Sequence, residues 1–335
     1  MVSDMPNIEL TQALRSGDPA AAVRPSDEGR AAAPRRRGLV RRVAGLRGSR
    51  NRHFYWFALP SILLVTVFFI VPFVANGVFA FLQWTGYSNT IRWTGLGNFR
   101  LVNALGILWH AVTVTVIYAV TGLIVQNAVS LCLAKALQRT SRANTVFRAV
   151  FFIPVLISPL AAGYIWAAVF SLNGPVNTVL RAILPGGFHF NWLGSNAWAL
   201  IIVACIDAWK LSGLITLVYI AGLNRIPRSV LEAATIDGAG AWRRFWKVEF
   251  PLLAPAFTFN IVVSLVGAFS AMDVVFSTTS GGPGDATTLL NVAVYDQYGQ
   301  GLFGTASALS FVVSVMAIIT AVPLIGWLRR REVQL

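Results

Sequence analysis

The chain has 335 residues, of which 56% are hydrophobic and only 12% are charged. Soluble domains carry about 25% charged residues, so this composition excludes an ordinary soluble domain and indicates a membrane protein. The net charge of +14 also fits a nucleic-acid-binding chain. However, most basic residues lie in a tail and in short loops between apolar runs, which is typical of a multi-pass membrane protein.

Residues 1–53 form a polar tail rich in Arg and Ala, without the periodicity of a helix or a strand. The tail holds 11 of the 27 Lys and Arg residues, among them the run 35–37. We expect it to be disordered and cytoplasmic, with a loose attraction to anionic lipid. Nucleic-acid binding is an alternative for the tail alone, and salt-dependent mixing with DNA would test it.

Six apolar segments follow, each near the length of about 20 residues that a membrane-spanning helix needs. They cover residues 54–82, 108–134, 149–170, 198–222, 252–276 and 305–327. We therefore predict an all-α membrane protein with six transmembrane helices in a domain of residues 54–328, and a short C-terminal segment, 329–335. Pro60 and Pro72 lie inside the first segment, where they are expected to kink or interrupt it.

The basic residues between the apolar segments alternate in density. The tail, the loops after the second and fourth segments, and the C-terminus together carry 23 Lys and Arg residues. The opposite side carries three, namely Arg92, Arg100 and Arg181. The positive-inside rule therefore predicts that both termini are cytoplasmic and that the chain lies in the inner (plasma) membrane of a prokaryote.

The polar stretch after the fourth segment is the most informative part of the chain. It reads PRSVLEAATIDGAGAWRRFWKVEFPLLAP over residues 227–255. Ser229 and Glu232 fit a capping box, which predicts a short helix over residues 230–237. Gly238 is well placed to end that helix, because glycine readily adopts the left-handed conformation.

A second short helix is predicted to begin near Ala241. In it Trp242, Phe245 and Trp246 share one face, and the basic residues fall largely on the other. Such a helix is expected to lie in the headgroup layer of the membrane. Pro251 is expected to open the fifth span, where its missing N–H does no harm.

Residues 223–251, called the EAA loop below, resemble the cytoplasmic loop of that name in permeases of binding-protein-dependent ABC importers. The family pattern is Glu-Ala-Ala, a Gly six residues after the Glu, then a hydrophobic position and Leu-Pro. Phe250 departs mildly from the pattern, because it replaces the usual Leu. The matching positions are Glu232, Ala233, Ala234, Asp237, Gly238 and Pro251.

Shorter fragments resemble the carbohydrate (maltose-type) branch of the same family. They are Gly95–Phe99, Gly174–Asn177 and Gly281–Pro283, and together they extend the resemblance over roughly residues 55–330. The resemblance implies a permease subunit that forms the path for a sugar delivered by an extracytoplasmic solute-binding protein. It also implies a second homologous permease as partner, and a cytoplasmic ATPase subunit that receives the short helix from Glu232 to Gly238.

Two alternatives stay open at this point. The first keeps the permease but replaces the sugar with a glycerol-phosphate ester or a polyol. The second is an ATP-independent secondary transporter or channel, which the small number of intramembrane charges disfavours.

The sequence indicates that ATP hydrolysis belongs to another polypeptide. Lys135, Lys210 and Lys247 are the only lysines, and none completes the P-loop pattern G-x-x-x-x-G-K-[ST]. ATP and Mg²⁺ are therefore expected to bind the partner ATPase. The three histidines and two cysteines lack metal-site spacing, so we expect no catalytic residue, cofactor or metal in this chain.

Four residues are candidates for lining the translocation path. Asp207 and Lys210 share a face of the fourth segment, and a structural ion pair turned toward the bundle is the plainer interpretation. Asp273 resembles a family position, and two roles stay open for it: facing the path or capping a helix end. Trp166 offers an aromatic face of the kind that sugars bind, although packing and interfacial roles are commoner for tryptophan.

Overall fold

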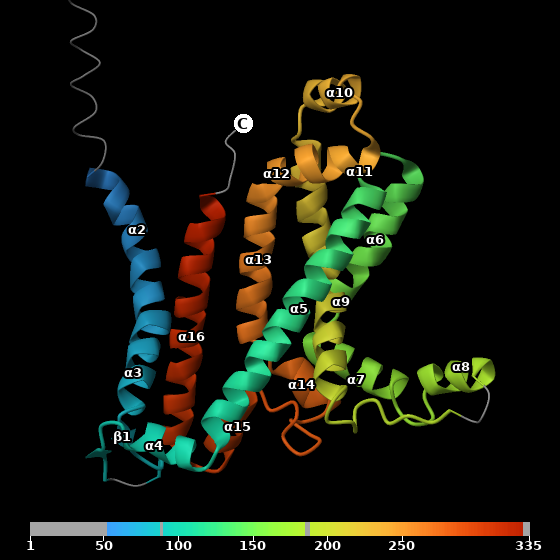
Figure 1. Cartoon of the computed structure of the whole chain (residues 1–335). Coiled ribbons are helices and arrows are strands. Elements are labelled where there is room, and N and C mark those ends of the chain that lie inside the picture. Colours follow the sequence, from blue (N-terminus) through green and yellow to red (C-terminus); the bar gives the residue numbers. More distant parts are fainter. Residues whose placement is uncertain (1–51, 88–89, 185–187, 331–335) are drawn as a thin grey trace, which may run out of the picture. The chain divides into compact units, whose positions relative to one another are not determined.

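The computed structural model describes residues 52–87, 90–184 and 188–330, and these residues are mostly helical (Figure 1). By internal packing the chain divides into two compact units, residues 1–63 and 64–335. The predicted tail lies outside the described residues, apart from its last two positions, and so do the last five residues of the C-terminal segment.

Four continuous helical stretches in the described part of the chain are long and apolar enough to cross a membrane. They are residues 58–79, α5 (Ile107–Leu137), α9 (Ala199–Asn224) and α16 (Phe303–Arg329). The number rises to six if each of two bent helix pairs is one span. The prediction of a helical membrane protein is confirmed in a coarser form: the described residues are mostly helical, with four to six candidate spans and one small two-stranded sheet.

The first apolar segment is one helix that passes through both of its prolines. It comprises α2 (Arg52–Val65), the π-helical turn η1 (Thr66–Ile70) and α3 (Val71–Phe79). The π-turn ends two residues before Pro72, and the Val71 amide donates to the Thr66 carbonyl across it. A wider turn accommodates the local loss of a backbone donor, so the expected interruption is reduced to a change of helical pitch.

The third predicted span, residues 149–170, is instead two helices that meet at an angle of 101°. α6 (Arg142–Leu156) begins seven residues earlier than predicted, and α7 (Pro159–Val169) follows the bend. The residue before a proline avoids the helical region, and Ser158 is extended, with ψ of 147°. Its hydroxyl then accepts from the Ala161 amide at 3.2 Å and caps α7.

The fifth predicted span, residues 252–276, is also shorter than expected. It contains α13 (Ala254–Phe269), and residues beyond it form the separate helix α14 (Asp273–Thr278). Pro255, rather than Pro251, occupies the first turn of α13, because a bend of 71° separates α13 from the helical segment that contains Pro251. The prediction that Pro251 opens this span is therefore wrong.

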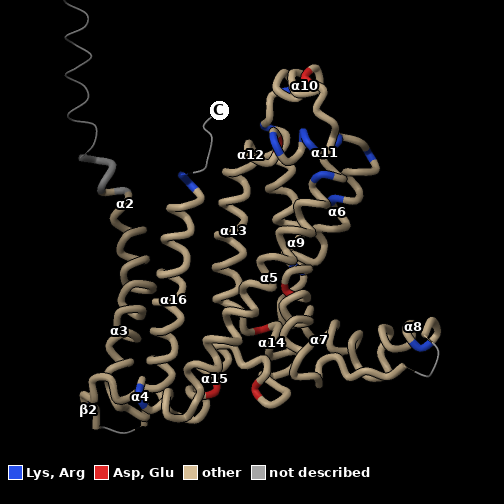
Figure 2. The backbone as a smooth tube through the Cα atoms, viewed as in Figure 1, with Lys and Arg blue, Asp and Glu red and all other residues tan. Residues whose placement is uncertain are grey.

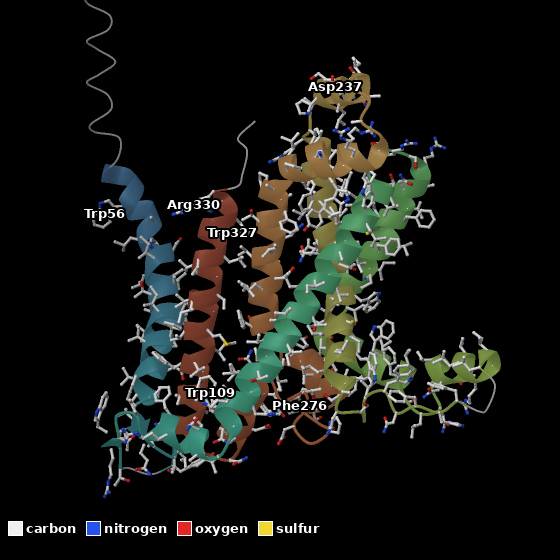
Figure 3. All side chains as sticks on the ribbon, viewed as in Figure 1. Trp56, Trp109, Asp237, Phe276, Trp327 and Arg330 are labelled. Atoms are coloured by element: carbon white, nitrogen blue, oxygen red, sulfur yellow. The ribbon has the colours of Figure 1, made fainter. Side chains whose placement is uncertain are left out.

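Several short elements of the 64–335 unit lie at the end of the bundle opposite α10 (Arg228–Ile236), and α8 projects sideways from it (Figure 1). β1 and β2 pair antiparallel, with Leu82 opposite Trp93. Trp109 and Phe276 lie at this end as well (Figure 3). The elements are β1 (Leu82–Gln83), β2 (Arg92–Trp93), α4 (Gly97–Ala104), α8 (Pro175–Ile183) and α15 (Leu290–Gly299).

A polar seam joins α5, α9 and α13 in the middle of the apolar bundle. The Tyr219 hydroxyl of α9 donates to Asn127 Oδ1 of α5 at 2.7 Å, and Asn127 Nδ2 donates to Ser264 of α13 at 3.3 Å. One turn further along α5, the Ser130 hydroxyl donates to the Ser212 carbonyl of α9 at 3.0 Å. Hydrogen bonds of this kind hold helices together where lipid supplies no hydrophobic driving force.

Close backbone contact supplements the seam on the other side of α9. A Cβ placed on Gly213 would lie 2.2 Å from the Phe151 carbonyl oxygen of α6. Glycine at this position therefore lets the two backbones approach closely, as small residues do at membrane helix interfaces.

We predict that Gly213→Ala destabilises the α6–α9 contact by about 1–3 kcal/mol, because the methyl group forces the helices apart. Gly326→Ala is the matched control, since Gly326 lies on the apolar helix α16 with open space around its Cβ position. Thermal unfolding of the detergent-purified chain measures the difference. Equal melting temperatures for the two variants would contradict the assigned packing role.

Candidate functional site: the EAA loop

The two ends of the 64–335 unit differ in how many basic residues they carry (Figure 2). Lys and Arg gather at the end that carries α10 (Arg228–Ile236) and α11 (Ala241–Arg244). The sparse set predicted for the other side is found at the opposite end, with Arg181 on α8 and Arg100 on α4. The alternation seen in the sequence therefore corresponds to two ends of one bundle.

α10 is the short helix predicted within the EAA loop, but it starts differently from the prediction. Pro227 is its N-cap residue, with ψ of 136°, and no side chain caps this end. Ser229 consequently lies inside the first turn rather than before it, so the predicted capping box with Glu232 is wrong. The fixed φ of Pro227 suits the residue that enters a helix, and it begins the helix at Arg228.

The other end of α10 is as predicted. Gly238 has φ of +74°, and its amide donates to the Thr235 carbonyl at 3.1 Å. The next amide, Ala239, donates back to the Ala234 carbonyl at 3.0 Å. These two hydrogen bonds form a Schellman motif, which fixes the direction in which the chain leaves the helix.

α10 presents most of the family-matched residues to the outside of the molecule. Glu232, Ala233 and Asp237 are exposed, and Ile236 is 87% exposed. Asp237 lies at the tip of the 64–335 unit (Figure 3). The outer face of α10 therefore combines charged and apolar side chains that the rest of the bundle does not cover.

The inner face of α10 is attached to the bundle below it. Ala234 is buried, and Leu231 packs against an apolar cluster at the ends of α5 and α9 that includes Leu223 and Ile226. Beside this contact runs an open groove lined by Arg228, Leu231, Glu232, Thr235, Ile236 and Arg244. The helix is therefore anchored on one face and accessible on the other.

The second predicted helix begins at Ala241, as expected. It continues through the π-helical turn η2 (Phe245–Glu249) into α12 (Phe250–Leu252). Trp242 and Trp246 are exposed and contact each other, with ring centroids 5.7 Å apart. Pro251 lies in α12 and is also exposed, so its place in the family pattern is at the bend between the EAA loop and α13.

Glu249 is a central residue of the site that the sequence analysis did not single out. Its side chain is 4% exposed, and it forms ion pairs with Lys135 at the end of α5 and with Arg244 of α11. Arg244 Nη1 also donates to the Thr235 hydroxyl of α10 at 3.2 Å. The signal was an acidic residue in a basic loop, but its partner Lys135 is remote in the sequence.

The expected ion pair between Asp207 and Lys210 is not formed. In the described residues the ion pairs are the two made by Glu249. Asp207 instead accepts a hydrogen bond from the Tyr118 hydroxyl of α5 at 3.1 Å, across the most extensive helix contact in the described residues. Lys210 is buried on the same helix. The Asp207 carboxyl group faces α5, because the Tyr118 hydroxyl on that helix donates a hydrogen bond to it.

The other path candidates lie in separate surroundings. Trp166 packs edge-on against Trp209, with centroids 5.3 Å apart, and lines an apolar cavity of about 350 Å³ between α7 and α9. Its buried Nε1–H has no hydrogen-bond partner among the described residues. Asp273 is exposed in the first turn of α14, where a carboxylate suits the helix dipole. Asp207, Lys210 and Asp273 do not line the cavity of Trp166.

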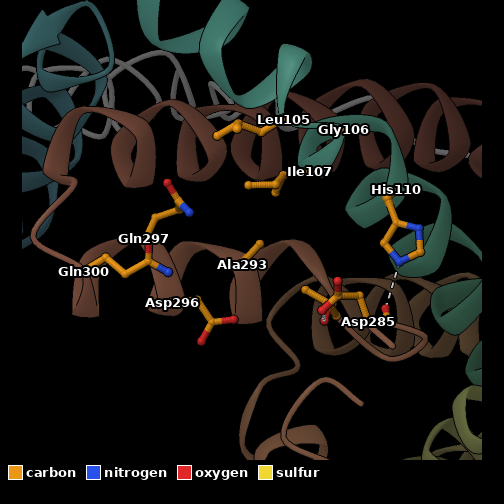
Figure 4. Close-up of a pocket in the computed structure, with 10 residues that line it drawn as sticks. Leu105, Gly106, Ile107, His110, Asp285, Ala293, Asp296, Gln297 and Gln300 are labelled. Atoms are coloured by element: carbon orange, nitrogen blue, oxygen red, sulfur yellow. Dashed lines mark hydrogen bonds between the residues drawn. The ribbon is translucent and has the colours of Figure 1, made fainter. Parts of the chain in front are cut away.

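A polar pocket of about 390 Å³ lies at the end opposite the EAA loop (Figure 4). It is formed where the start of α5 meets α15 and the loop before it, and His110 Nε2 lies 2.8 Å from the Asp285 carbonyl oxygen. Burial raises the pKa of the Asp296 carboxyl, and the nearby Asp285 carboxylate raises it further. Sequence reasoning missed this pocket, because its two sides are more than 170 residues apart.

Comparison with known proteins agrees with this arrangement. The family model described as "Binding-protein-dependent transport system inner membrane component" matches residues 126–331, which include the whole EAA loop. The chain belongs to this family. It is thus a multi-pass inner-membrane permease subunit, and the resemblance noted from the sequence is confirmed.

Similar permeases cover most of the chain. A probable starch degradation products transport system permease from Thermoanaerobacterium thermosulfurigenes is 32% identical over 254 residues, or 73% of this chain and 83% of that protein. An sn-glycerol-3-phosphate transport system permease from Brucella abortus is 35% identical over 274 residues, or 80% and 90% of the two chains.

A solved structure has the same fold. A chain of a bacterial ABC transporter involved in the import of the acidic polysaccharide alginate superposes with a TM-score of 0.71. The match covers 87% of this chain and 99% of that chain at 19% sequence identity.

We predict that Gly238→Ala weakens the C-terminal end of α10 by about 1–2 kcal/mol, because an alanine at a positive φ is strained. Gly240→Ala is the matched control. Neither glycine has another atom within 4 Å of its Cβ position, and only Gly238 has a positive φ. Hydrogen exchange of the amides in residues 234–239 should speed up in the first variant and stay unchanged in the second.

Proposed function

We propose that this chain is the transmembrane permease subunit of an ATP-driven importer, and that it forms the path for a sugar delivered by a solute-binding protein. The observation that carries the proposal is the EAA loop in its structural setting. Its short helix stands exposed at the basic end of an apolar helical bundle, in a chain that belongs to the permease family.

The proposed topology has six spans, with the N-terminus and the EAA loop in the cytoplasm. Six spans follow if each bent helix pair crosses the membrane once. The cytoplasmic side is assigned to the end where basic residues concentrate. On this topology the polar pocket around His110 opens on the extracytoplasmic side, where the solute-binding protein would deliver its cargo.

The proposed partners are two ATPase domains, a second homologous permease and the solute-binding protein. ATP and Mg²⁺ would be held by the ATPase, in agreement with the lack of a P-loop in the sequence. Glu232, Ala233, Ala234, Asp237 and Gly238 would form the part of α10 that the ATPase grips. Closure of the ATPases would then move α10 and rock the spans between inward-facing and outward-facing states.

A sugar is the proposed solute class. A permease for starch degradation products and an alginate importer are among the similar proteins, and both act on carbohydrates. The aromatic cavity around Trp166 and Trp209 offers the flat apolar surfaces on which sugar rings stack. The glycerol-phosphate permease from Brucella makes a phosphate ester the natural competitor in a test.

We predict that Glu232→Ala and Gly238→Val reduce ATPase binding and solute uptake at least about tenfold, which corresponds to about 1.4 kcal/mol. The first removes an exposed charge of α10, and the second distorts the end of the helix. Co-purification of the ATPase with the tagged chain measures binding. Arg181→Gln, at the opposite end of the bundle, is the control. Full ATPase binding and uptake in both loop variants would refute the coupling role.

We predict that membrane vesicles containing the complete transporter and its solute-binding protein accumulate a labelled oligosaccharide when MgATP is supplied to the ATPase side. Labelled sn-glycerol 3-phosphate is the competitor substrate. Uptake of the phosphate ester in preference to any sugar would overturn the solute class. Uptake that persists without MgATP would overturn the ATP-driven mechanism itself.

A further inference from the structure

The carboxylate of Glu249 lies at the junction of three structural elements. Lys135 Nζ from α5 donates to one carboxylate oxygen, and Arg244 Nε from α11 donates to the other at 3.3 Å. Arg244 Nη1 reaches on to the Thr235 hydroxyl of α10 at 3.2 Å. A continuous polar chain therefore runs from the exposed short helix to the long helix α5.

The π-helical turn η2 makes this junction possible. Its widened turn is closed by a hydrogen bond from the Phe250 amide to the Phe245 carbonyl, five residues apart. Residues five apart diverge on an α-helix but lie on one face where the turn is widened in this way. Arg244 and Glu249 are five residues apart, so the π-turn lets both side chains face α10 and α5 together.

Glu249 is the most deeply buried of the three ion-paired side chains. The Glu249 side chain is 4% exposed, whereas Lys135 and Arg244 are 33% and 31% exposed. A buried carboxylate is costly to separate from a cationic partner, because each separation leaves its charge less well compensated. The Lys135 ammonium also lies 5.6 Å from the centroid of the Phe245 ring, which holds it on the same side.

The end of α5 that holds Lys135 lies close to the polar seam that joins α5 to α9 and α13. α5 carries Ser130 and Asn127 of the polar seam, about one and two turns further into the bundle. A displacement of that end is therefore passed directly to α9 and α13. The backbone leads from α10 to α9 on one side and through α11, η2 and α12 to α13 on the other, and Leu231 adds an apolar contact with the cluster that includes Ala134 of α5.

We propose that Glu249 is a positioning residue that transmits movement of α10 to α5 through the Lys135–Glu249–Arg244–Thr235 chain. The inference rests on the proposed docking of an ATPase on α10. It assigns to Glu249 and Lys135 a role downstream of docking: they decide whether the motion of the ATPase reaches the long helices, and they do not contribute to ATPase binding.

The test compares Lys135→Gln and Glu249→Gln with two controls in the complete transporter. Lys247→Gln makes the same chemical change on an exposed residue of η2, and Glu249→Asp keeps the charge. Hydrogen–deuterium exchange is measured with and without MgATP and orthovanadate. The readouts are residues 228–239, around α10, and residues 131–148, which contain the end of α5 and the start of α6.

The expected result separates the two regions. In the wild type and in Lys247→Gln, nucleotide should change exchange in both. In Lys135→Gln and Glu249→Gln it should change exchange around α10 only, and uptake per ATP hydrolysed should fall about fivefold or more, the size of an ordinary allosteric coupling. Glu249→Asp should restore most of the response of residues 131–148.

Three outcomes would overturn the inference. One is a normal nucleotide response of residues 131–148 in Glu249→Gln and Lys135→Gln. Another is equal behaviour of Lys135→Gln and Lys247→Gln. The third is loss of the ATPase from both Gln variants, because that would make the pair part of the docking surface. Failure of the proposed function would look different, since α10 of the wild type would then show no response to nucleotide.

Discussion

The pairing of α5 with α9 is the constraint on which the rest of the bundle depends. Tyr118 and Asn127 of α5 hydrogen-bond to Asp207 and Tyr219 of α9, and Ser264 of α13 joins through Asn127. In an apolar environment water cannot replace these bonds, so the three helices keep one register. The bent pair α6–α7, the EAA loop and the polar pocket at the far end are all positioned by helices of this group.

Much of the fold follows from local properties of the sequence. Apolar length located the long helices, and the left-handed preference of glycine located the end of α10 at Gly238. The local rule for residues before proline also explains the break at Ser158, although apolarity alone suggested one span across it. At Ser229 the capping-box pattern was misleading, because Pro227 starts the helix earlier and leaves no free turn for the serine to cap.

The parts that could not be predicted depend on pairs distant in the chain. Glu249 meets Lys135 across 114 residues, and nothing in the neighbourhood of either residue indicates its partner. Lys210 is only three residues from Asp207. The Asp207 carboxyl group nevertheless accepts its hydrogen bond from the Tyr118 hydroxyl, 89 residues away in the sequence. Helix periodicity describes which residues share a face, whereas the choice of partner depends on which neighbouring helix offers a donor at the same depth.

The exposed side chain of Ile236 has a consequence for the temperature dependence of docking. Ile236 is 87% exposed at the end of α10, on the face that the bundle leaves uncovered. If the ATPase covers this face as proposed, burial of the side chain would contribute about 1.5–3 kcal/mol to docking. Because hydrophobic stabilisation weakens on cooling, this share of the affinity would fall at low temperature.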